Sequence, residues 1–83
     1  MIDSSKMGRF IVGKRKELGL TQHQLAQKLN VSFQAISKWE TGASFPNIEI
    51  LKDLASVLEV TTDEILAGSE KEENGLSYSM EKL

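Results

Sequence analysis

The fold of this chain is decided by residues 21–42, which read TQHQLAQKLNVSFQAISKWETG. Thr21 and Gln24 are spaced as a capping box, the pair of side chains that starts a helix. Three apolar residues then fall on one face at helical spacing: Leu25, Ala26 and Leu29. Asn30 tolerates the left-handed backbone that a tight turn requires. The first half of the stretch therefore predicts a helix over residues 22–29 that ends in a turn.

The second half of the stretch predicts another helix. Ser32 is a good cap, and Gly42 ends the helix at about Thr41, because glycine adopts the left-handed backbone at little cost. Three apolar residues share one side of this helix and form its predicted buried face: Ala35, Ile36 and Trp39. Residues 21–42 as a whole read helix, turn, helix.

Capping and apolar spacing outside this stretch predict three more helices, and no strand signal is found. The first is predicted to start after a cap at Ser4 or Ser5, to run to about residue 18 and to end at Gly19. The second is predicted over residues 48–58, with Asn47 as its cap. The third is predicted over residues 63–67, with Thr61 or Thr62 as its cap, and it ends at Gly68. The predicted core residues of the two longer helices are Phe10, Ile11, Leu18, Ile48, Leu51, Leu54, Ala55 and Leu58. We therefore expect an all-α domain over residues 1–68, followed by a short polar, acidic tail over residues 69–83.

Charge is distributed unevenly along the chain. The 83 residues together carry a net charge of −2, and this overall charge argues against a nucleic-acid partner. Residues 1–42, however, carry seven basic and three acidic side chains, whereas residues 43–83 carry three basic and nine acidic ones. Such asymmetry is typical of a protein with one surface that faces a polyanion. The charges of the two halves could equally do no more than solvate two faces.

Several classes of protein are disfavoured by composition. The chain has no cysteine, and it shows no metal-ligand spacing, phosphate-binding glycine loop or nucleophile–base arrangement. We expect no enzyme activity, cofactor or metal, and no small-molecule effector is evident. No apolar run approaches the roughly 20 residues of a membrane helix, and the N-terminus lacks a signal-peptide core. A cytoplasmic protein is expected. The single histidine, His23, is predicted to lie on the exposed surface.

The segments Leu20–Ser32 and Ala35–Gly42 closely resemble the Cro/CI-like, or Xre-type, helix-turn-helix family. Arg15 and the loop Phe45–Asn47 fit the same pattern, and the resemblance covers about residues 6–68. It implies a five-helix lambda-repressor-like fold, sequence-specific binding of double-stranded DNA in the major groove, and regulation of transcription, as a repressor. It also implies a homodimer on an operator site.

The outward side of the helix after Ser32 carries hydrogen-bonding groups and no carboxylate. These residues are Gln34, Ser37, Lys38 and Thr41. Glutamine pairs with adenine, lysine donates to guanine and serine suits either base. With the resemblance, we predict that bases are read by Phe33, Gln34, Ser37 and Lys38. Phe33 departs from the polar residue usual at its position in the family: its ring could contact a thymine methyl group or pack over the preceding helix.

Backbone phosphates are expected near helix N-termini, which offer free N–H groups. Gln22 starts a helix, and its position in the family commonly contacts a phosphate. The other predicted phosphate contacts are Ser32, Thr41, Ser44 and Asn47. For Gln22 and Asn47, capping and solubility are the alternative roles. The resemblance further predicts a partly buried ion pair between Arg15 and Glu40, because Glu40 lies about 40° from Ile36, toward the core.

A protein-interaction module, such as an antitoxin, is the main alternative. A bundle that binds protein would be expected to present an apolar or acidic face where this chain has glutamine, serine, lysine and threonine, although an antitoxin can also bind DNA. For a dimer, the available surface is predicted to include Val60, Ile65, Leu66 and the tail. Within the tail, an apolar stripe would form if the segment became helical: Leu76, Met80 and Leu83. Such a short segment either docks or stays disordered.

Overall fold

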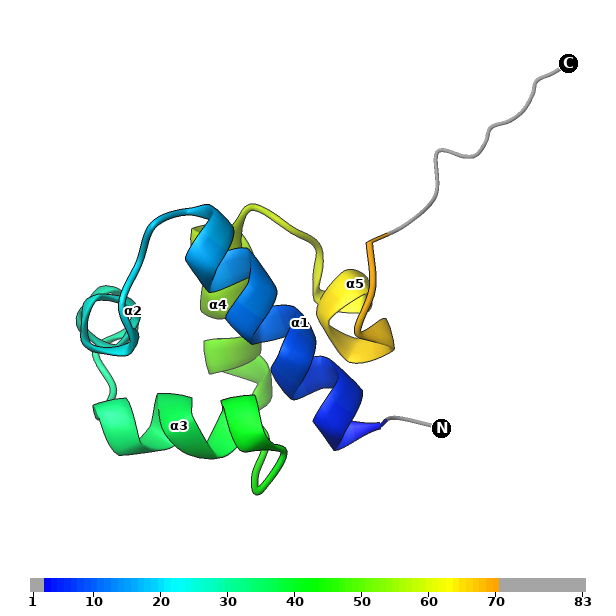
Figure 1. The fold of residues 1–83 in the computed structure, drawn as a ribbon, viewed down its shortest axis with the longest axis horizontal. Helices are drawn as coiled ribbons and strands as arrows, with labels where there is room; N and C mark the ends of the chain where they lie inside the picture. Colours follow the sequence, from blue (N-terminus) through cyan, green and yellow to red (C-terminus); the bar gives the residue numbers. More distant parts are fainter. Residues whose placement is uncertain (1–2, 71–83) are drawn as a thin grey trace, which may run out of the picture.

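The computed structural model describes residues 3–70 and folds them into five helices without a strand. The helices are α1 (Ser4–Glu17), α2 (Gln22–Leu29), α3 (Phe33–Thr41), α4 (Ile48–Leu58) and α5 (Thr62–Ala67) (Figure 1). The predicted all-α, five-helix class is confirmed. Among residues 3–70, none of the helices has the length and apolar character needed to cross a membrane. The predicted tail stripe of Leu76, Met80 and Leu83 lies outside the described residues.

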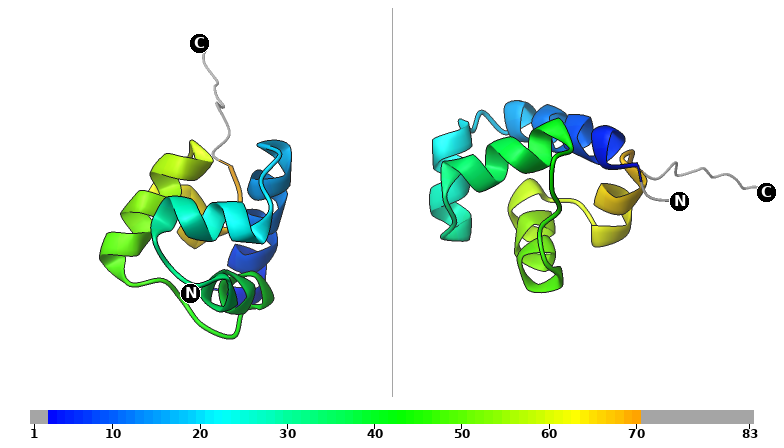
Figure 2. Two further views of the ribbon diagram at one scale, coloured as in Figure 1. Left: turned by 90° about the vertical axis from the view of Figure 1, so that its left-hand side faces the viewer. Right: turned by 90° about the horizontal axis from the view of Figure 1, so that it is seen from below.

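Helix α1 crosses the middle of the bundle and packs against α3, α4 and α5 (Figure 1). Helix α2 packs against α3 and α4. Figure 2 shows, on its left, α2 from the side and α3 almost end-on, so these two helices cross at a steep angle. Every helix contributes to one core, whose buried residues are Met7, Ile11, Leu25, Ala26, Leu29, Ile36, Trp39, Leu51, Leu54, Ala55, Leu58 and Ile65.

The N-terminal cap of each helix is a side-chain oxygen that accepts from a backbone N–H in the first turn. The caps are Asp3, Thr21, Ser32, Asn47 and Thr61. The predicted cap of the first helix is wrong, because the Asp3 carboxylate accepts from the backbone of Ser5 and Lys6 at 3.0 and 3.1 Å. The open choice between Thr61 and Thr62 is resolved by a capping box that joins Thr61 to Glu64.

Two residues predicted to be in the core are at the surface. Leu18 is 37% exposed and Ile48 is 64% exposed. Leu18 follows the last turn of α1, where it lines an open pocket. Ile48 has the helical phase of Leu51 but occupies the first turn of α4, which lies at the outer edge of the bundle (Figure 2). The prediction also missed Met7, which is 2% exposed and packs where α1 meets the rest of the core.

An ion pair joins Glu70, the last described residue, to Lys14 of α1. The ammonium group of Lys14 donates to the carboxylate of Glu70, and it donates at 3.2 Å to that of Glu17. The hydrogen bond with Glu70, followed by that with Glu17, raises the pKa of Lys14 above its ordinary value. Residues 69–70 therefore return along the outside of α1 after α5 ends.

Candidate nucleic-acid interface

A tight turn between α2 and α3 fixes the relative direction of these helices. Asn30 adopts the left-handed backbone, with φ of 57°, and the N–H of Val31 donates to the carbonyl of Ala26 at 3.0 Å. Ser32 is extended and caps α3 by accepting from the N–H of Ala35 at 3.2 Å. The chain thus leaves one helix and starts the next within three residues, which is the geometry of a helix-turn-helix.

Helix α3 lies at the lower edge of the molecule in Figure 1, and one of its faces is buried while the other is open. Its buried face consists of Ile36 and Trp39, which are 0% and 5% exposed. The predicted core role of Trp39 is confirmed, so its ring is not available for stacking on a base. On the opposite face Gln34, Lys38 and Thr41 are exposed, and Ser37 is half-buried. The structure therefore gathers Gln34, Ser37 and Lys38, the polar residues predicted to read bases, on the open side of α3, together with Thr41.

The one acidic residue of α3 points away from this open face. The predicted ion pair is present: Oε2 of Glu40 lies 2.6 Å from Nε of Arg15, and Oε1 lies 3.1 Å from a second guanidinium nitrogen. The side chains of Arg15 and Glu40 are only 11% and 5% exposed. A third guanidinium nitrogen donates to the carbonyl of Leu20 at 2.9 Å. The pair thus ties α1 to α3 and to the chain that enters α2.

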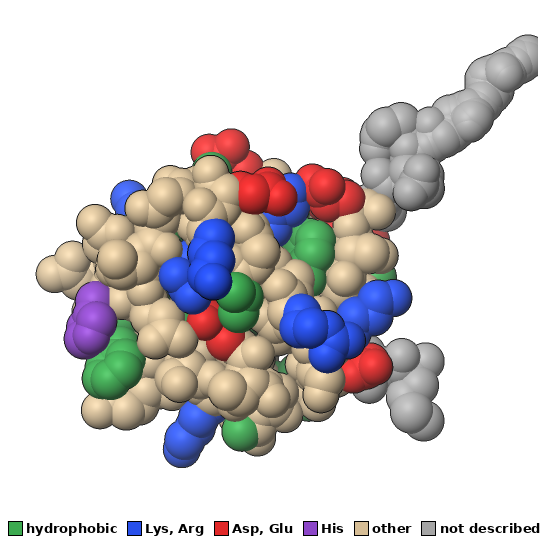
Figure 3. Space-filling model, in the orientation of Figure 1, with side chains coloured by type: hydrophobic (Ala, Val, Ile, Leu, Met, Phe, Trp, Pro, Cys, Tyr) green, Lys and Arg blue, Asp and Glu red, His purple; other side chains and the backbone are tan. Residues whose placement is uncertain are grey.

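The electrostatic consequence is a helix-turn-helix surface without an exposed carboxylate. Glu40 is the only acidic residue between Thr21 and Ala43, and Arg15 neutralises it below the surface. Two exposed lysines remain in the same segment, Lys28 and Lys38. In Figure 3, a basic side chain and no acidic one is seen along the lower edge where Figure 1 places α3. Such a surface is suited to approach a polyanion.

The residues predicted to contact phosphate are mostly engaged within the protein. The amide nitrogen of Gln22 donates to Oε1 of Glu40 at 2.8 Å, so this side chain belongs to the Arg15–Glu40 cluster. Oxygens of Ser32 and Asn47 accept from backbone N–H groups as caps, and the hydroxyl of Thr41 donates to the carbonyl of Lys38. Ser44, by contrast, is half-buried, and its side chain takes part in none of the hydrogen bonds among residues 3–70. Phosphate contact by these residues stays a prediction.

Phe33 packs against a residue of α2, which was one of the two alternatives left open by the sequence. Its ring stacks on that of His23, with centroids 4.3 Å apart and planes inclined by 22°. Phe33 nevertheless remains 38% exposed, and His23 is exposed as predicted. Sequence reasoning treated the two residues separately, because nothing in a spacing of ten residues indicates that the turn brings their rings together.

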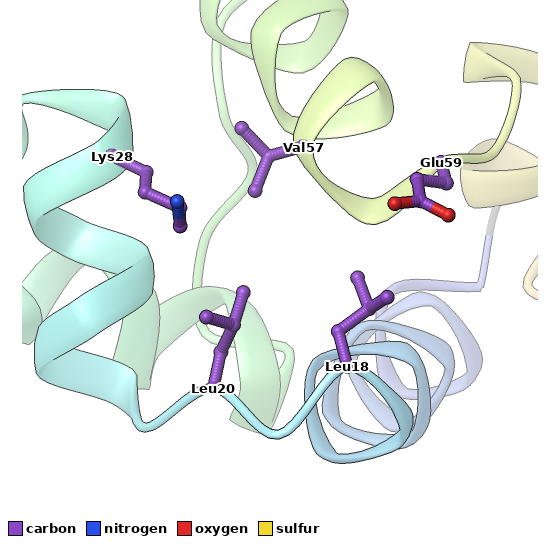
Figure 4. Close-up of a pocket in the computed structure, with 5 residues that line it drawn as sticks. All are labelled: Leu18, Leu20, Lys28, Val57 and Glu59. Atoms are coloured by element: carbon purple, nitrogen blue, oxygen red, sulfur yellow. The ribbon is translucent and has the colours of Figure 1, made fainter.

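An open pocket of about 290 Å³ was not indicated by the sequence. Figure 4 shows its lining side chains, which come from the end of α1, from the loop between α1 and α2, from α2 and from the end of α4, and none of which belongs to α3. They are Leu18, Leu20, Lys28, Val57 and Glu59. The described residues hold no group of three His, Cys, Asp or Glu side chains that could bind a metal ion.

The surface predicted for pairing two copies is largely part of the core. Ile65 is 0% exposed, and Val60 and Leu66 are half-buried against the core cluster. The prediction is wrong for Ile65, because α5 turns this side chain inward against its own domain. The large apolar side chains that the described structure does expose are Leu18, Phe33, Phe45 and Ile48.

Comparison with known proteins places this geometry in one family. The family model described as Helix-turn-helix matches residues 14–65. The transcriptional activator BcrR of Enterococcus faecalis is 55% identical over 67 residues, covering 81% of this chain and 31% of that protein. Repressor protein C2 of Salmonella phage P22 is 34% identical over 78 residues, covering 94% and 36%. The chain thus spans about a third of the length of these two relatives.

Two solved structures of DNA complexes have the same fold. The P22 c2 repressor bound to a synthetic operator superimposes with a TM-score of 0.73 at 38% identity, covering 76% of this chain and 96% of that one. SinR bound to DNA gives 0.67 at 31% identity, covering 72% and 97%. The chain belongs to the helix-turn-helix family, in its Cro/CI-like, Xre-type branch, and has the lambda-repressor-like fold.

Proposed function

We propose that residues 1–68 form a DNA-binding domain that places α3 in the major groove of a specific duplex site and regulates transcription there, as a repressor. One observation carries this proposal. The open face of α3 presents amide, hydroxyl and ammonium groups, while the only acid of that helix, Glu40, is buried against Arg15. A major groove offers acceptors, donors and methyl groups to such a face, and phosphates flank it on both sides.

Base recognition is assigned to the exposed side of α3. Gln34 is suited to donate to and accept from adenine, and Lys38 to donate to the two acceptors of guanine. Ser37 adds a shorter hydroxyl group nearer the helix axis, and Phe33 adds an apolar contact. The first residues of a recognition helix are the ones that contact base edges, which agrees with the positions of Phe33 and Gln34.

Positioning on the DNA backbone is assigned to the N-terminal ends of the helices. We infer that Gln22, Ser32 and Asn47 contact phosphates while they keep their roles as caps or partners of Glu40, since a hydroxyl or amide group has further hydrogen-bonding capacity. Thr41 and Ser44 extend this set at the other end of α3. Phosphate contacts of this kind fix the register of the protein without reading sequence.

The active form is proposed to be a homodimer in the cytoplasm that binds its site without catalysis. A single module of this size contacts few base pairs and gives limited specificity. Two copies on half-sites one helical turn apart, about 34–36 Å, double the contacts. The tail over residues 69–83 is not needed for base recognition in this proposal.

The function is tested by selecting duplexes from a random pool with the full 83-residue chain and titrating the enriched site at two salt concentrations. Log affinity should fall with log salt by about 0.9 for every phosphate that is neutralised. Lys38→Gln should weaken binding, whereas Lys52→Gln, the same change at an exposed position of α4, should not. Affinity that is independent of salt, or a pool without an enriched site, would contradict the proposal.

A reporter gene that carries the enriched site decides the direction of regulation. Reduced transcription in the presence of the chain supports repression, and increased transcription contradicts it. A chain that enriches no DNA site but binds one cellular protein tightly would instead support the alternative of an antitoxin or another protein-interaction module.

A further inference from the structure

The stacked rings of His23 and Phe33 form a small aromatic surface at the exposed N-terminal end of α3. Phe33 is the first residue of α3, and His23 is the second residue of α2. Their centroids lie 4.3 Å apart. Phe33 belongs neither to the buried core nor to the apolar side chains packed against it. The imidazole therefore covers one face of the phenyl ring. Packing against the core does not explain why Phe33 lies where it does.

The exposure of the Phe33 ring to water is energetically unfavourable, which indicates that Phe33 has a role other than packing in the core. A phenyl ring that is 38% exposed leaves apolar area in water, in a helix-turn-helix whose other outward groups are polar. Figure 3 shows the purple histidine beside an apolar side chain at the left margin of this face, with no acidic side chain around them. An exposed apolar contact of this kind is suited to an apolar group on the partner.

The major groove presents one such group. The C5-methyl of thymine is the apolar feature among the base edges, whereas cytosine shows an amino donor and purines show acceptors or donors. A ring held in place by stacking gives up less freedom when it binds than an unsupported side chain would. His23 thereby restricts Phe33 before the DNA arrives.

We propose that Phe33, oriented by His23, is a specificity determinant that recognises the methyl group of a 5-methylpyrimidine at the base pair nearest the N-terminus of α3. Phe33 touches the methyl group, and His23 is a positioning residue that acts through the ring. This inference rests on the proposed function, because it names a chemical feature of the site that α3 reads. It gives His23 a role in DNA recognition that is distinct from helix capping and from solubility.

The test removes single methyl groups from the DNA. Each thymine of the enriched site is replaced in turn by deoxyuridine, which pairs identically and lacks only the methyl. With the wild-type chain, one position in each half-site should lose affinity about three- to five-fold, the amount expected for burial of one methyl group. Phe33→Ala should abolish the difference between thymine and deoxyuridine at that position. A 5-methylcytosine should bind better than cytosine there.

His23 is tested by its effect on the same difference rather than on affinity alone. His23→Ala should reduce the preference for thymine, and His23→Tyr, which restores a ring that can stack, should recover it. Phe33→Leu keeps an apolar side chain but removes the ring, and it replaces Phe33→Ala in the test if that variant does not fold. The inference would be overturned if deoxyuridine lowered the affinity of the wild-type chain and of the Phe33 variants equally, or if no thymine methyl affected affinity. Either result would leave the proposed function intact. A chain that binds no duplex overturns both.

Discussion

Gly8 of α1 lies directly against the backbone of Glu40 in α3. A β-carbon built on Gly8 would stand 2.3 Å from the carbonyl oxygen of Glu40 and 2.7 Å from that of Trp39. Real β-carbons do not approach backbone atoms so closely, so only glycine lets the two helices meet at this distance. The same contact holds the last turn of α3 beside the helix that supplies Arg15.

The two glycines of α1 are therefore expected to respond in opposite ways to the same substitution. Gly8→Ala should destabilise the domain by about 1–3 kcal/mol, because the backbone of α3 must move away. Gly13→Ala should stabilise it by about 0.5–1 kcal/mol, because nothing lies within 4 Å of the new β-carbon and alanine favours the helix. Urea unfolding of both variants measures the difference. Stabilisation by both substitutions would contradict the close approach.

Removal of one partner of the Arg15–Glu40 ion pair should cost far more stability than removal of one partner of a surface pair. Glu40→Gln leaves the buried guanidinium without its counter-charge, and removal of one partner from a well-buried pair costs about 3–5 kcal/mol. Glu17→Gln is the matched control, because the Glu17 side chain is 67% exposed and such pairs are worth at most about 1 kcal/mol. Denaturant unfolding of the two variants gives both values. Equal, small losses would mean that the Arg15–Glu40 pair is effectively solvated.

Base preference should depend on Gln34 and Lys38. Replacement of either by alanine is expected to cost about 1–3 kcal/mol on the best site and to relax the preference at one base pair. Gln22→Ala should instead weaken all sequences to a similar extent. Selection from random duplexes with each variant shows the motif directly. An unchanged motif for Gln34→Ala would remove this residue from the reading surface.

Assembly on DNA should involve two copies of the chain. Sedimentation at micromolar concentration, with and without a palindromic site, is expected to show two protomers per duplex. One protomer on an asymmetric site would contradict the dimer. Deletion of residues 69–83 tests the tail separately, because an unchanged assembly would remove only its role in pairing. Since Ile65 is buried, a dimer surface that includes its side chain is not expected.

Local chemistry in the sequence was sufficient for most of the fold. Each helix start has a side-chain oxygen in the right place, and the left-handed residues Asn30, Gly42 and Gly68 stand where helices end. These signals act over three or four residues, so they can be read without the tertiary structure. The exposed polar face of α3 followed from the same local periodicity. The resemblance to a known family then supplied the fold name and the partner of Glu40.

Contacts between distant residues were decided only in the tertiary structure. Helical phase placed Ile48 and Leu18 in the core, yet burial also requires a neighbouring helix at that level, and none covers them. Nothing in the residues around Gly8 indicates why glycine is needed there, because the carbonyl of Glu40 that requires it comes 32 residues later. The stacking of His23 on Phe33 likewise arises from the crossing of α2 and α3. Periodicity describes one helix at a time, whereas the reading surface depends on how two helices meet.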